Sequence, residues 1–161
     1  GVRLYPTHHG YDFTSPAVGQ LFDLAARQRL LVQIVWRLED ERTQHPLVTA
    51  AAVDHAPLVK LVQQQPKLRL MLLNCQRDLR GEALSQMAEA GNVVFDIAMQ
   101  EGVGGIERLA QQIPYERIVF GSHAPVFIHE AAVLKLRESE LGQVVLDAVT
   151  RANAERAVRR E

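Results

Sequence analysis

Five short apolar runs, each followed by a helix-like segment, constrain the fold of this chain more than any other feature. The runs are rich in Val, Ile and Leu and almost continuous, which is typical of strands buried on both faces of a parallel sheet. Strand–helix units repeated with short connections predict parallel strands joined by right-handed crossovers. The predicted strands are residues 2–5, 31–36, 68–74, 92–98 and 117–121.

Helices are predicted between these strands from capping residues and apolar spacing. Ser15 and Pro16 indicate a helix start, because Ser caps helices and Pro suits the first turn. Asp54 precedes a second helix, which ends at Pro66. Further helices are expected over about 80–90, between Gly105 and Pro114, and, as two or three helices, over 129–159.

Five strand–helix units are compatible with an open doubly wound sheet or with part of an eight-stranded (β/α)8 TIM barrel. The pattern alone does not decide between these architectures. The glycine cluster at 102–105 lacks the Gly-x-Gly-x-x-Gly spacing and a P-loop lysine, so we expect a flexible loop there and no nucleotide site. Residues 1–161 suit a single α/β domain with a sizeable core.

Composition and charge exclude several classes of function. The formal net charge is -1, so the chain has no basic surplus for a nucleic-acid backbone or an anionic membrane surface. No apolar run reaches the ~18 residues that a membrane span needs. The single Cys75 excludes an internal disulfide and a Cys-based zinc cluster. We therefore expect a cytoplasmic protein that acts on a small molecule, without nucleic-acid or membrane partners.

The first residue is Gly1, and the chain passes at once into strand-like sequence. We therefore expect a fragment or a processed piece of a longer protein. Five strands cannot close an eight-stranded barrel, so two strand edges would be open. On its own, the piece is expected to associate, for example as a homo-oligomer, or to misfold.

Ligands of a parallel sheet bind where the strands end, so the residues after each strand are the candidates for a site. Four of the six histidines fall there, and histidine supplies both metal ligands and general bases near neutral pH. His8 and His9 are adjacent, and adjacent side chains usually point apart, so at most one of these two histidines is expected in the site. The candidate metal ligands are His8, His9, His45 and His123.

Two residues are the candidates for catalysis. His123 lies in Gly-Ser-His-Ala-Pro, directly after the fifth strand, where a functional role is favoured over a structural hydrogen bond. Asp96 lies inside an apolar strand, where a charge is costly unless it is paired. Asp96 is therefore either a carboxylate of the site or a buried structural partner.

Polar side chains at the strand ends are candidates for substrate binding. A long loop, about 37–53, follows the second strand, and long loops of this kind are usually functional or disordered. Its charged run is interpreted either as a substrate-binding segment or as a solvated, ion-paired loop. The candidate substrate-binding residues are Arg3, Tyr5, Arg37, Glu41, Arg42 and Asn74.

Four segments, in chain order, resemble the amidohydrolase-related (amidohydrolase 2-type) family of metal-dependent hydrolases. GVRLYPTHHGY at 1–11 is similar to a strand that opens into the active site, and NVVFDIA at 92–98 to the seventh strand. ERIVFGSHAP at 116–125 resembles the last-strand motif, which usually reads Gly-Ser-Asp-x-Pro, and RANAERAV at 151–158 the closing helix. The resemblance implies strands four to eight of a TIM barrel, with the N-terminal barrel half and its His-x-His metal pair outside this chain.

Three positions that hold ligands in the family differ in this chain. The Asp of the last strand is His123, the His of strand six corresponds to Asn74, and the His of strand five falls at Val35 or Trp36. A binuclear centre is therefore not expected. The resemblance instead implies a single divalent metal, Zn or Mn, or no metal. Replacement ligands would come from His8, His9, His45 and His123.

Two functional hypotheses follow. In the first, the protein is a hydrolase that acts on a small, carboxylate-bearing substrate through water activated by a metal or by His123, while Asp96 orients groups or accepts a proton. Arginine side chains would hold the substrate carboxylate. In the second, it is a metal-independent lactonase or decarboxylase relative, or a non-catalytic barrel that binds a ligand. An enzyme is favoured, because a decayed site would not need a polar ring around an apolar barrel.

Overall fold

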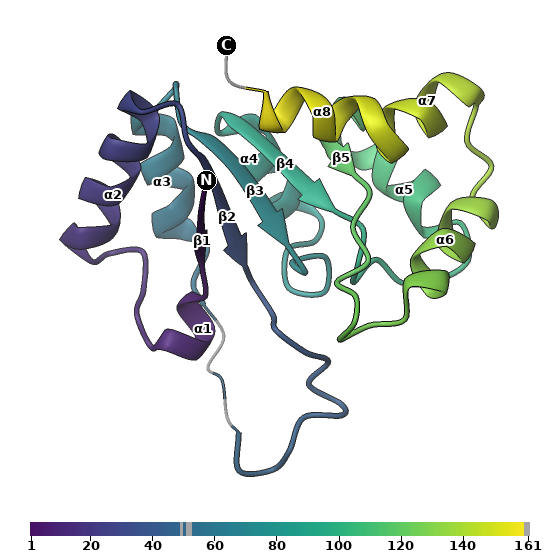
Figure 1. The fold of residues 1–161 in the computed structure, drawn as a ribbon, viewed down its shortest axis with the longest axis horizontal. Helices are drawn as coiled ribbons and strands as arrows, with labels where there is room; N and C mark the ends of the chain where they lie inside the picture. Colours follow the sequence, from purple (N-terminus) through teal and green to yellow (C-terminus); the bar gives the residue numbers. More distant parts are fainter. Residues whose placement is uncertain (49, 51–52, 160–161) are drawn as a thin grey trace.

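The described part of the computed structural model, residues 1–48, 50 and 53–159, forms one sheet of five parallel strands in the order β1-β2-β3-β4-β5 (Figure 1). All five predicted strands are confirmed, and each is shorter than its apolar run. Asn74, for example, adopts a φ of 59°, which turns the chain away at the end of the third strand. The strands are β1 (Val2–Leu4), β2 (Leu31–Val35), β3 (Arg69–Leu73), β4 (Asn92–Asp96) and β5 (Ile118–Val119).

Helices follow the strands at the predicted places. These are α2 (Pro16–Arg27), α3 (Ala56–Gln64), α4 (Glu82–Glu89) and α5 (Gly105–Gln112). The short 3₁₀ turn η1 (Tyr115–Arg117) leads into β5. The C-terminal stretch contains α6 (His129–Arg137), α7 (Gln143–Asp147), a π-helical turn η2 (Ala148–Ala152) and α8 (Asn153–Val158).

One short helix, α1 (Pro6–His9), follows β1, where no helix was predicted. Pro6 suits the first turn because its missing N–H would have no partner there. Gly10 ends the helix in the left-handed conformation, with φ 66°. His8 and His9 therefore lie in a helical turn that was not among the predicted helices.

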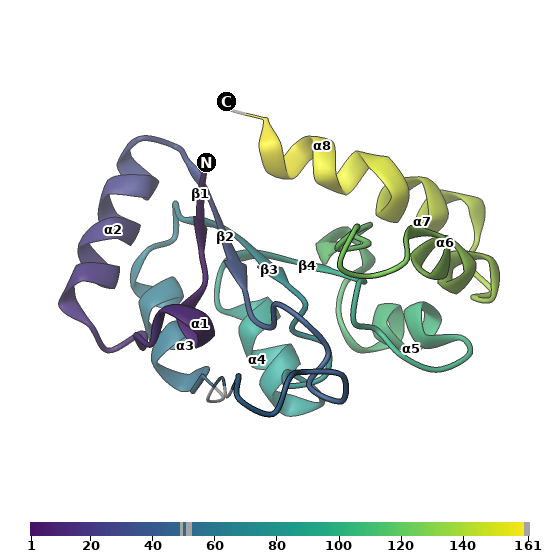
Figure 2. The same cartoon turned by 60° about the horizontal axis from the view of Figure 1, so that its bottom comes forward.

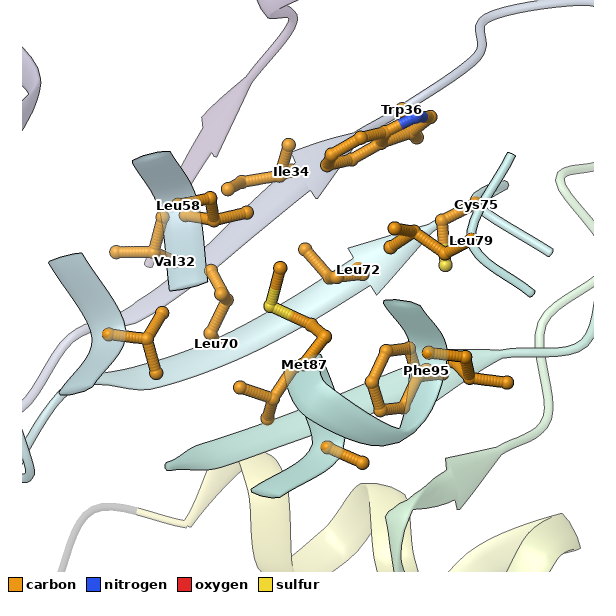
Figure 3. Packing of buried hydrophobic residues seen from close by; sticks show 14 of the residues in the cluster. Val32, Ile34, Trp36, Leu58, Leu70, Leu72, Cys75, Leu79, Met87 and Phe95 are labelled. Atoms are coloured by element: carbon orange, nitrogen blue, oxygen red, sulfur yellow. The ribbon is translucent and has the colours of Figure 1, made fainter. Parts of the chain in front are cut away.

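The main core lies between the sheet and helices α2 to α5. Alternate strand residues point to the helices, and in β2 and just after it these are Val32, Ile34 and Trp36. Figure 3 shows these residues packed with side chains of β3, β4 and the helices. Each fully buried large aliphatic side chain contributes roughly 1.5–3 kcal/mol to the hydrophobic term, so this layer fixes the strand positions.

The opposite face of the sheet carries a smaller apolar cluster and is partly covered by α8. Figure 2 shows α3 and α4 on one side of the strands and α8 on the other. Arg3 and Gln33 are register partners beside Met71 and share this face, since they alternate with the helix-facing residues. The cluster itself consists of Leu31, Met71, Val94 and Val119, packed against Leu73, Ala154 and Ala157.

No helix among residues 1–48, 50 and 53–159 is long and apolar enough to cross a membrane. The loop after β2 extends beyond the carboxyl edge of the sheet as far as residue 48 (Figure 1). Residues 49, 51 and 52 of the expected loop 37–53 lie outside the described residues.

Candidate active site

Hydrogen bonds join the loops that follow four neighbouring strands at the carboxyl edge of the sheet. The Asn74 side-chain N–H donates to the carbonyl oxygen of Arg37 at 2.7 Å, and its backbone N–H donates to Oδ1 of Asp96 at 2.8 Å. Nε2 of His123 lies 2.7 Å from the carbonyl oxygen of Leu38. Both predicted catalytic residues and two predicted substrate-binding residues therefore belong to one hydrogen-bonded edge.

Asp96 is a nearly buried carboxyl group, with 3% of its surface exposed. Burial raises its pKa to about 6, against opposing effects from the backbone N–H groups of Asn74 and Ala98 and from the charge of Lys135. Burial also lowers the pKa of Lys135, whose ammonium group donates to the carbonyl oxygens of Ala98 and Ile97. A carboxyl group with a pKa near neutrality suits acid–base chemistry.

Gly121 lets the loop after β5 pack directly on the Asp96 carboxyl group. A Cβ atom at Gly121 would lie 2.8 Å from the Asp96 Cβ and 2.9 Å from its Oδ2. Two residues further on, His123 has a φ of 54°. The left-handed region is costly for side chains other than glycine, and residues held there tend to cluster at functional sites.

The hydrogen bond of His123 also assigns the protons of its ring. A carbonyl oxygen can only accept, so Nε2 of His123 carries the hydrogen that it shares with Leu38. In the neutral ring, Nδ1 is then the basic nitrogen. The ring is half-buried and packs 5.2 Å from that of Phe127, measured between centroids.

Arg37, a predicted substrate-binding residue, is engaged in ion pairs. Its Nε and Nη2 donate to the two carboxylate oxygens of Asp78, both at 2.7 Å, and its Nη1 lies 2.9 Å from Glu41. The hydrogen bonds that Arg37 donates to the Asp78 carboxylate are the main cause of a raised pKa at Arg37. The guanidinium of Arg37 is thus shared between Asp78 and Glu41, another predicted binding residue.

Arg42 lies in a second cluster of the same kind. Its guanidinium contacts Asp40 at 2.6 Å and Glu101 at 2.9 Å, while Arg77 contacts Asp40 at 2.8 Å. The hydrogen bond from Arg42 holds the pKa of Asp40 well below its usual range. The charged run is ion-paired in the structure, and these pairs tie the segments after β2, β3 and β4 together.

The two remaining predicted binding residues lie near β1. Arg3, on the sheet face opposite the helices, donates from Nε to Oε1 of Gln33 at 2.8 Å. Tyr5 follows β1, and its ring centroid lies 5.6 Å from that of His9.

The histidines that were predicted as metal ligands have different surroundings in the structure. Nε2 of His8 is buried and has no hydrogen-bond partner among the described residues. His9 is exposed and packs between Tyr5 and Tyr11, with ring centroids 5.6 Å and 6.3 Å away. His45 is exposed in the loop, where its Nδ1 accepts a hydrogen bond from the backbone of Leu47.

A complete metal site does not fit the residues that the structure describes. Among them, no three His, Cys, Asp or Glu side chains converge in a way that could hold a metal ion. Nε2 of His123 already donates to a carbonyl oxygen. Trp36 faces the helices and stacks on Phe13, so it does not point to the site, and Val35 is apolar. We therefore derive no chemical step through a metal.

Three groups at the carboxyl edge of the sheet were not predicted from the sequence to take part in the site. Lys135 comes from α6, and its partners are backbone carbonyl oxygens 37 and 38 positions away. The carbonyl of Leu38 is 85 positions from His123. Gly121 was part of a recognised motif, but its close approach to Asp96 was not expected. Such contacts leave no pattern in sequence spacing.

Parallel strand–helix units with polar residues gathered at the carboxyl edge of the sheet define an α/β protein, either a barrel type or an open sheet. The family model described as amidohydrolase matches residues 1–160, and the chain belongs to the amidohydrolase family. No curated protein matches the chain.

Solved structures of similar fold include an uncharacterised TIM-barrel protein from Bordetella bronchiseptica, with a TM-score of 0.73 and 11% identity over 97% of this chain. A 2,6-dihydroxybenzoate decarboxylase from Rhizobium has a TM-score of 0.68 and 12% identity over 92% of the chain. A dihydroxybenzoic acid decarboxylase from Polaromonas, solved with manganese and 2-nitroresorcinol, has a TM-score of 0.67 and 8% identity over 92%.

The chain spans little more than half of each of these structures: 56% of the first, 57% of the second and 55% of the third. At such low identities the likeness concerns the fold alone. Together with five consecutive parallel strands and their helices, it decides between the two predicted architectures. The fold is a partial (β/α)8 barrel, as predicted, and not an open doubly wound sheet.

Proposed function

We propose that this chain carries the acid–base residues of a hydrolase that acts on a small, carboxylate-bearing substrate. The observation that carries the proposal is the 2.7 Å hydrogen bond between His123 and the carbonyl oxygen of Leu38. It leaves Nδ1 of the neutral ring as a base, at the edge of the sheet where barrel enzymes bind their substrates.

In the proposed reaction, Nδ1 of His123 accepts a proton from a water molecule as the water oxygen attacks the carbonyl carbon of an ester, lactone or amide. The carbon–leaving-group bond then breaks, and the proton on His123 passes to the leaving oxygen or nitrogen. The ring carries a positive charge between these steps. Asp96, which lies against Gly121 of the same loop, supports that charge in its ionised form.

Of the three arginines predicted to hold the substrate carboxylate, Arg3 has the guanidinium with the fewest partners. Its Nε binds Gln33, and its two Nη groups have no hydrogen-bond partner in the described part of the chain. Arg37 and Arg42 are less suited, because each would have to exchange a carboxylate partner for the substrate. Guanidinium groups bind carboxylates through paired N–H donors, which gives both charge and orientation.

The test compares two substitutions of His123 in the complete polypeptide that carries these residues. His123→Gln keeps a side-chain N–H for the carbonyl of Leu38 but has no base, whereas His123→Ala loses both. If His123 is the base, both variants lose at least about a hundredfold in kcat with phenyl acetate and a small lactone as probes. A glutamine variant that keeps its activity while the alanine variant loses it would reduce His123 to a structural role.

Decarboxylation is the second candidate, because structures of similar fold include 2,6-dihydroxybenzoate decarboxylases. In that reaction the bond from the ring carbon to the carboxylate breaks, carbon dioxide leaves, and an acid protonates the carbon. A reaction that needs a protonated acid is favoured by low pH, whereas a reaction that needs an unprotonated base is favoured by high pH. Release of carbon dioxide from 2,6-dihydroxybenzoate that falls as the pH rises through about 6, without ester hydrolysis, would select this reaction.

The likeness to a structure solved with manganese also makes metal content worth measuring. We propose that any metal in the complete protein depends on ligands beyond those described here. Elemental analysis of the purified protein, compared with the same analysis of His123→Gln, measures whether metal is present and whether His123 holds it.

A further inference from the structure

A basic, half-open cleft lies at the amino edge of the sheet, the edge opposite to the proposed active site. Its volume is about 960 Å³, and it is bounded by the end of α2, the segment before β3, the first residue of β4 and the end of α8. Figure 1 shows the ends of α2 and α8 above the amino ends of the strands. Six cations line it: Arg27, Arg29, Lys67, Arg69, Arg156 and Arg159.

The cleft concentrates positive charge in a chain whose net charge is -1. Among the described lining residues, Asp23 is the one acidic side chain, and it is hydrogen-bonded to the side chain of Gln65. The side chains of Arg27, Lys67 and Arg159 make no hydrogen bond or ion pair among the described residues. Like charges gathered in this way repel each other, and a bound anion relieves the repulsion.

Two of the six cations, Arg69 and Arg156, also make hydrogen bonds that stabilise the shape of the cleft. Arg69 donates from Nη1 to the carbonyl oxygen of Arg159, and Arg156 donates to the carbonyl oxygen of Glu116 at 2.7 Å. Nε of Arg69 is buried without a partner in the described part of the chain. Buried N–H groups normally have an acceptor, and the described residues offer none to this Nε–H.

We propose that this cleft binds a small molecule with two or more closely spaced phosphate groups. Guanidinium groups match phosphate oxygens with paired N–H donors, and lysine adds a compact positive charge. Several cations around one hollow suit several negative charges better than a single carboxylate. The volume lies within the range of about 300–1,000 Å³ that is usual for small-molecule pockets.

A nucleic acid is the less suitable occupant. Nucleic-acid binding depends on basic surface that follows the phosphate backbone, and this chain has no overall excess of positive charge. A bounded hollow at the end of a sheet also offers little length for a strand of nucleotides. We therefore assign the cleft to a compact ligand such as a pyrophosphate-bearing metabolite.

Calorimetric titration of the complete polypeptide with pyrophosphate and with ATP, at low ionic strength, tests the assignment. We expect both probes to bind more tightly than orthophosphate and to raise the melting temperature. Arg27→Glu and Lys67→Glu should each weaken binding by about tenfold or more, because a charge-assisted contact becomes a repulsion. Both residues are exposed, so folding should be preserved.

Arg137→Glu is the matched control, since Arg137 is an exposed arginine of α6 that does not line the cleft. The proposal is overturned if neither probe binds, or if Arg137→Glu weakens binding as much as the cleft variants do. It is also overturned if a 20-nucleotide RNA binds more tightly than both probes at the same salt concentration. Hydrolysis in the active-site assay is not expected to change in Arg27→Glu, so the two proposals fail independently.

Discussion

The backbone N–H of Asn74 donates to Oδ1 of Asp96 at 2.8 Å, and this bond holds the ends of β3 and β4 together at the proposed site. The geometry depends on the left-handed φ of 59° at Asn74. The amide group of the same residue reaches the carbonyl oxygen of Arg37, next to Leu38. One buried residue thus connects the carboxyl group of Asp96 with the loop that orients His123.

The raised pKa of Asp96 predicts a pH-dependent stability. Its pKa is about 6 in the folded protein and 3.8 ordinarily, so folding favours the protonated form. The stabilisation is complete below about pH 4 and is lost as the pH rises through about 6. From about pH 4 to 8, the free energy of unfolding should fall by about 3 kcal/mol relative to that of Asp96→Asn.

Urea denaturation of both proteins over this pH range measures the difference. Asparagine keeps an oxygen acceptor for the N–H of Asn74 but does not titrate. Taking the difference between the proteins removes the contributions of carboxylates with lowered pKa values, such as Asp40 and Asp12. Parallel stability curves would contradict a raised pKa at Asp96.

Gly121→Ala is predicted to disturb the proposed site directly. The added methyl group would lie 2.8 Å from Cβ of Asp96, closer than real Cβ contacts allow. We expect a loss of about 1–3 kcal/mol in the free energy of unfolding, as for other overpacked sites, together with a loss of hydrolysis.

Gly142→Ala is the control for this substitution, because a Cβ atom at Gly142 would have no neighbour within 4 Å. Its φ of -62° is also one that alanine adopts readily. Chemical denaturation and the phenyl acetate assay are applied to both variants. Equal losses of stability and of hydrolysis in Gly121→Ala and Gly142→Ala would show that contact with Asp96 does not cause these losses.

The ion pair between Arg37 and Asp78 is predicted to be the stronger kind of surface pair. It is bidentate, and the two side chains are only 16% and 25% exposed. A double-mutant cycle with Arg37→Met and Asp78→Asn should give a coupling energy of about 1–3 kcal/mol by urea denaturation.

Arg151 and Glu155 form the comparison pair, with side chains 81% and 53% exposed. Their cycle, with the same two kinds of substitution, should give no more than about 0.5 kcal/mol, and less at high salt. A coupling at Arg37 and Asp78 as small as this would mean that the pair does not hold the loops together.

The fold was largely predictable because its signals are local. Continuous apolar runs specify strands buried on both sides, and Ser15 and Asp54 precede the helices that follow, although the Ser15 side chain makes no capping hydrogen bond and the N-cap of α3 is His55. The exception is α1, whose four residues, Pro6–His9, have no apolar periodicity. Only the proline at its start and Gly10 at its end indicate a helical turn there.

The site was predictable only in part. The strand ends and the apolar surroundings of Asp96 placed the two candidate catalytic residues at the carboxyl edge of the sheet. The ion pairs of Arg37 and Arg42 follow from the conformations of three loops, which no periodicity specifies. The same holds for the link from His123 to Leu38, which depends on the path of the loop after β2.

The last prediction concerns the open edges of the sheet. In the described part of the chain, β1 pairs only with β2, and β5 only with β4. β5 has only two residues. Just after it, the backbone N–H of Phe120 donates to the carbonyl oxygen of Val149 in η2, so this N–H is not available to another strand. β1 is therefore the edge that is more open to another strand.

We expect these 161 residues, expressed alone, to associate through β1 as their concentration rises. Val2→Pro should weaken this association, since proline removes a backbone donor and is tolerated at the first position of a strand. Val2→Ile, which keeps the donor, is the matched control. Light scattering after size-exclusion chromatography, from about 10 to 200 µM, measures the mass. A constant monomer mass, or equal association of the two variants, would contradict pairing at this edge.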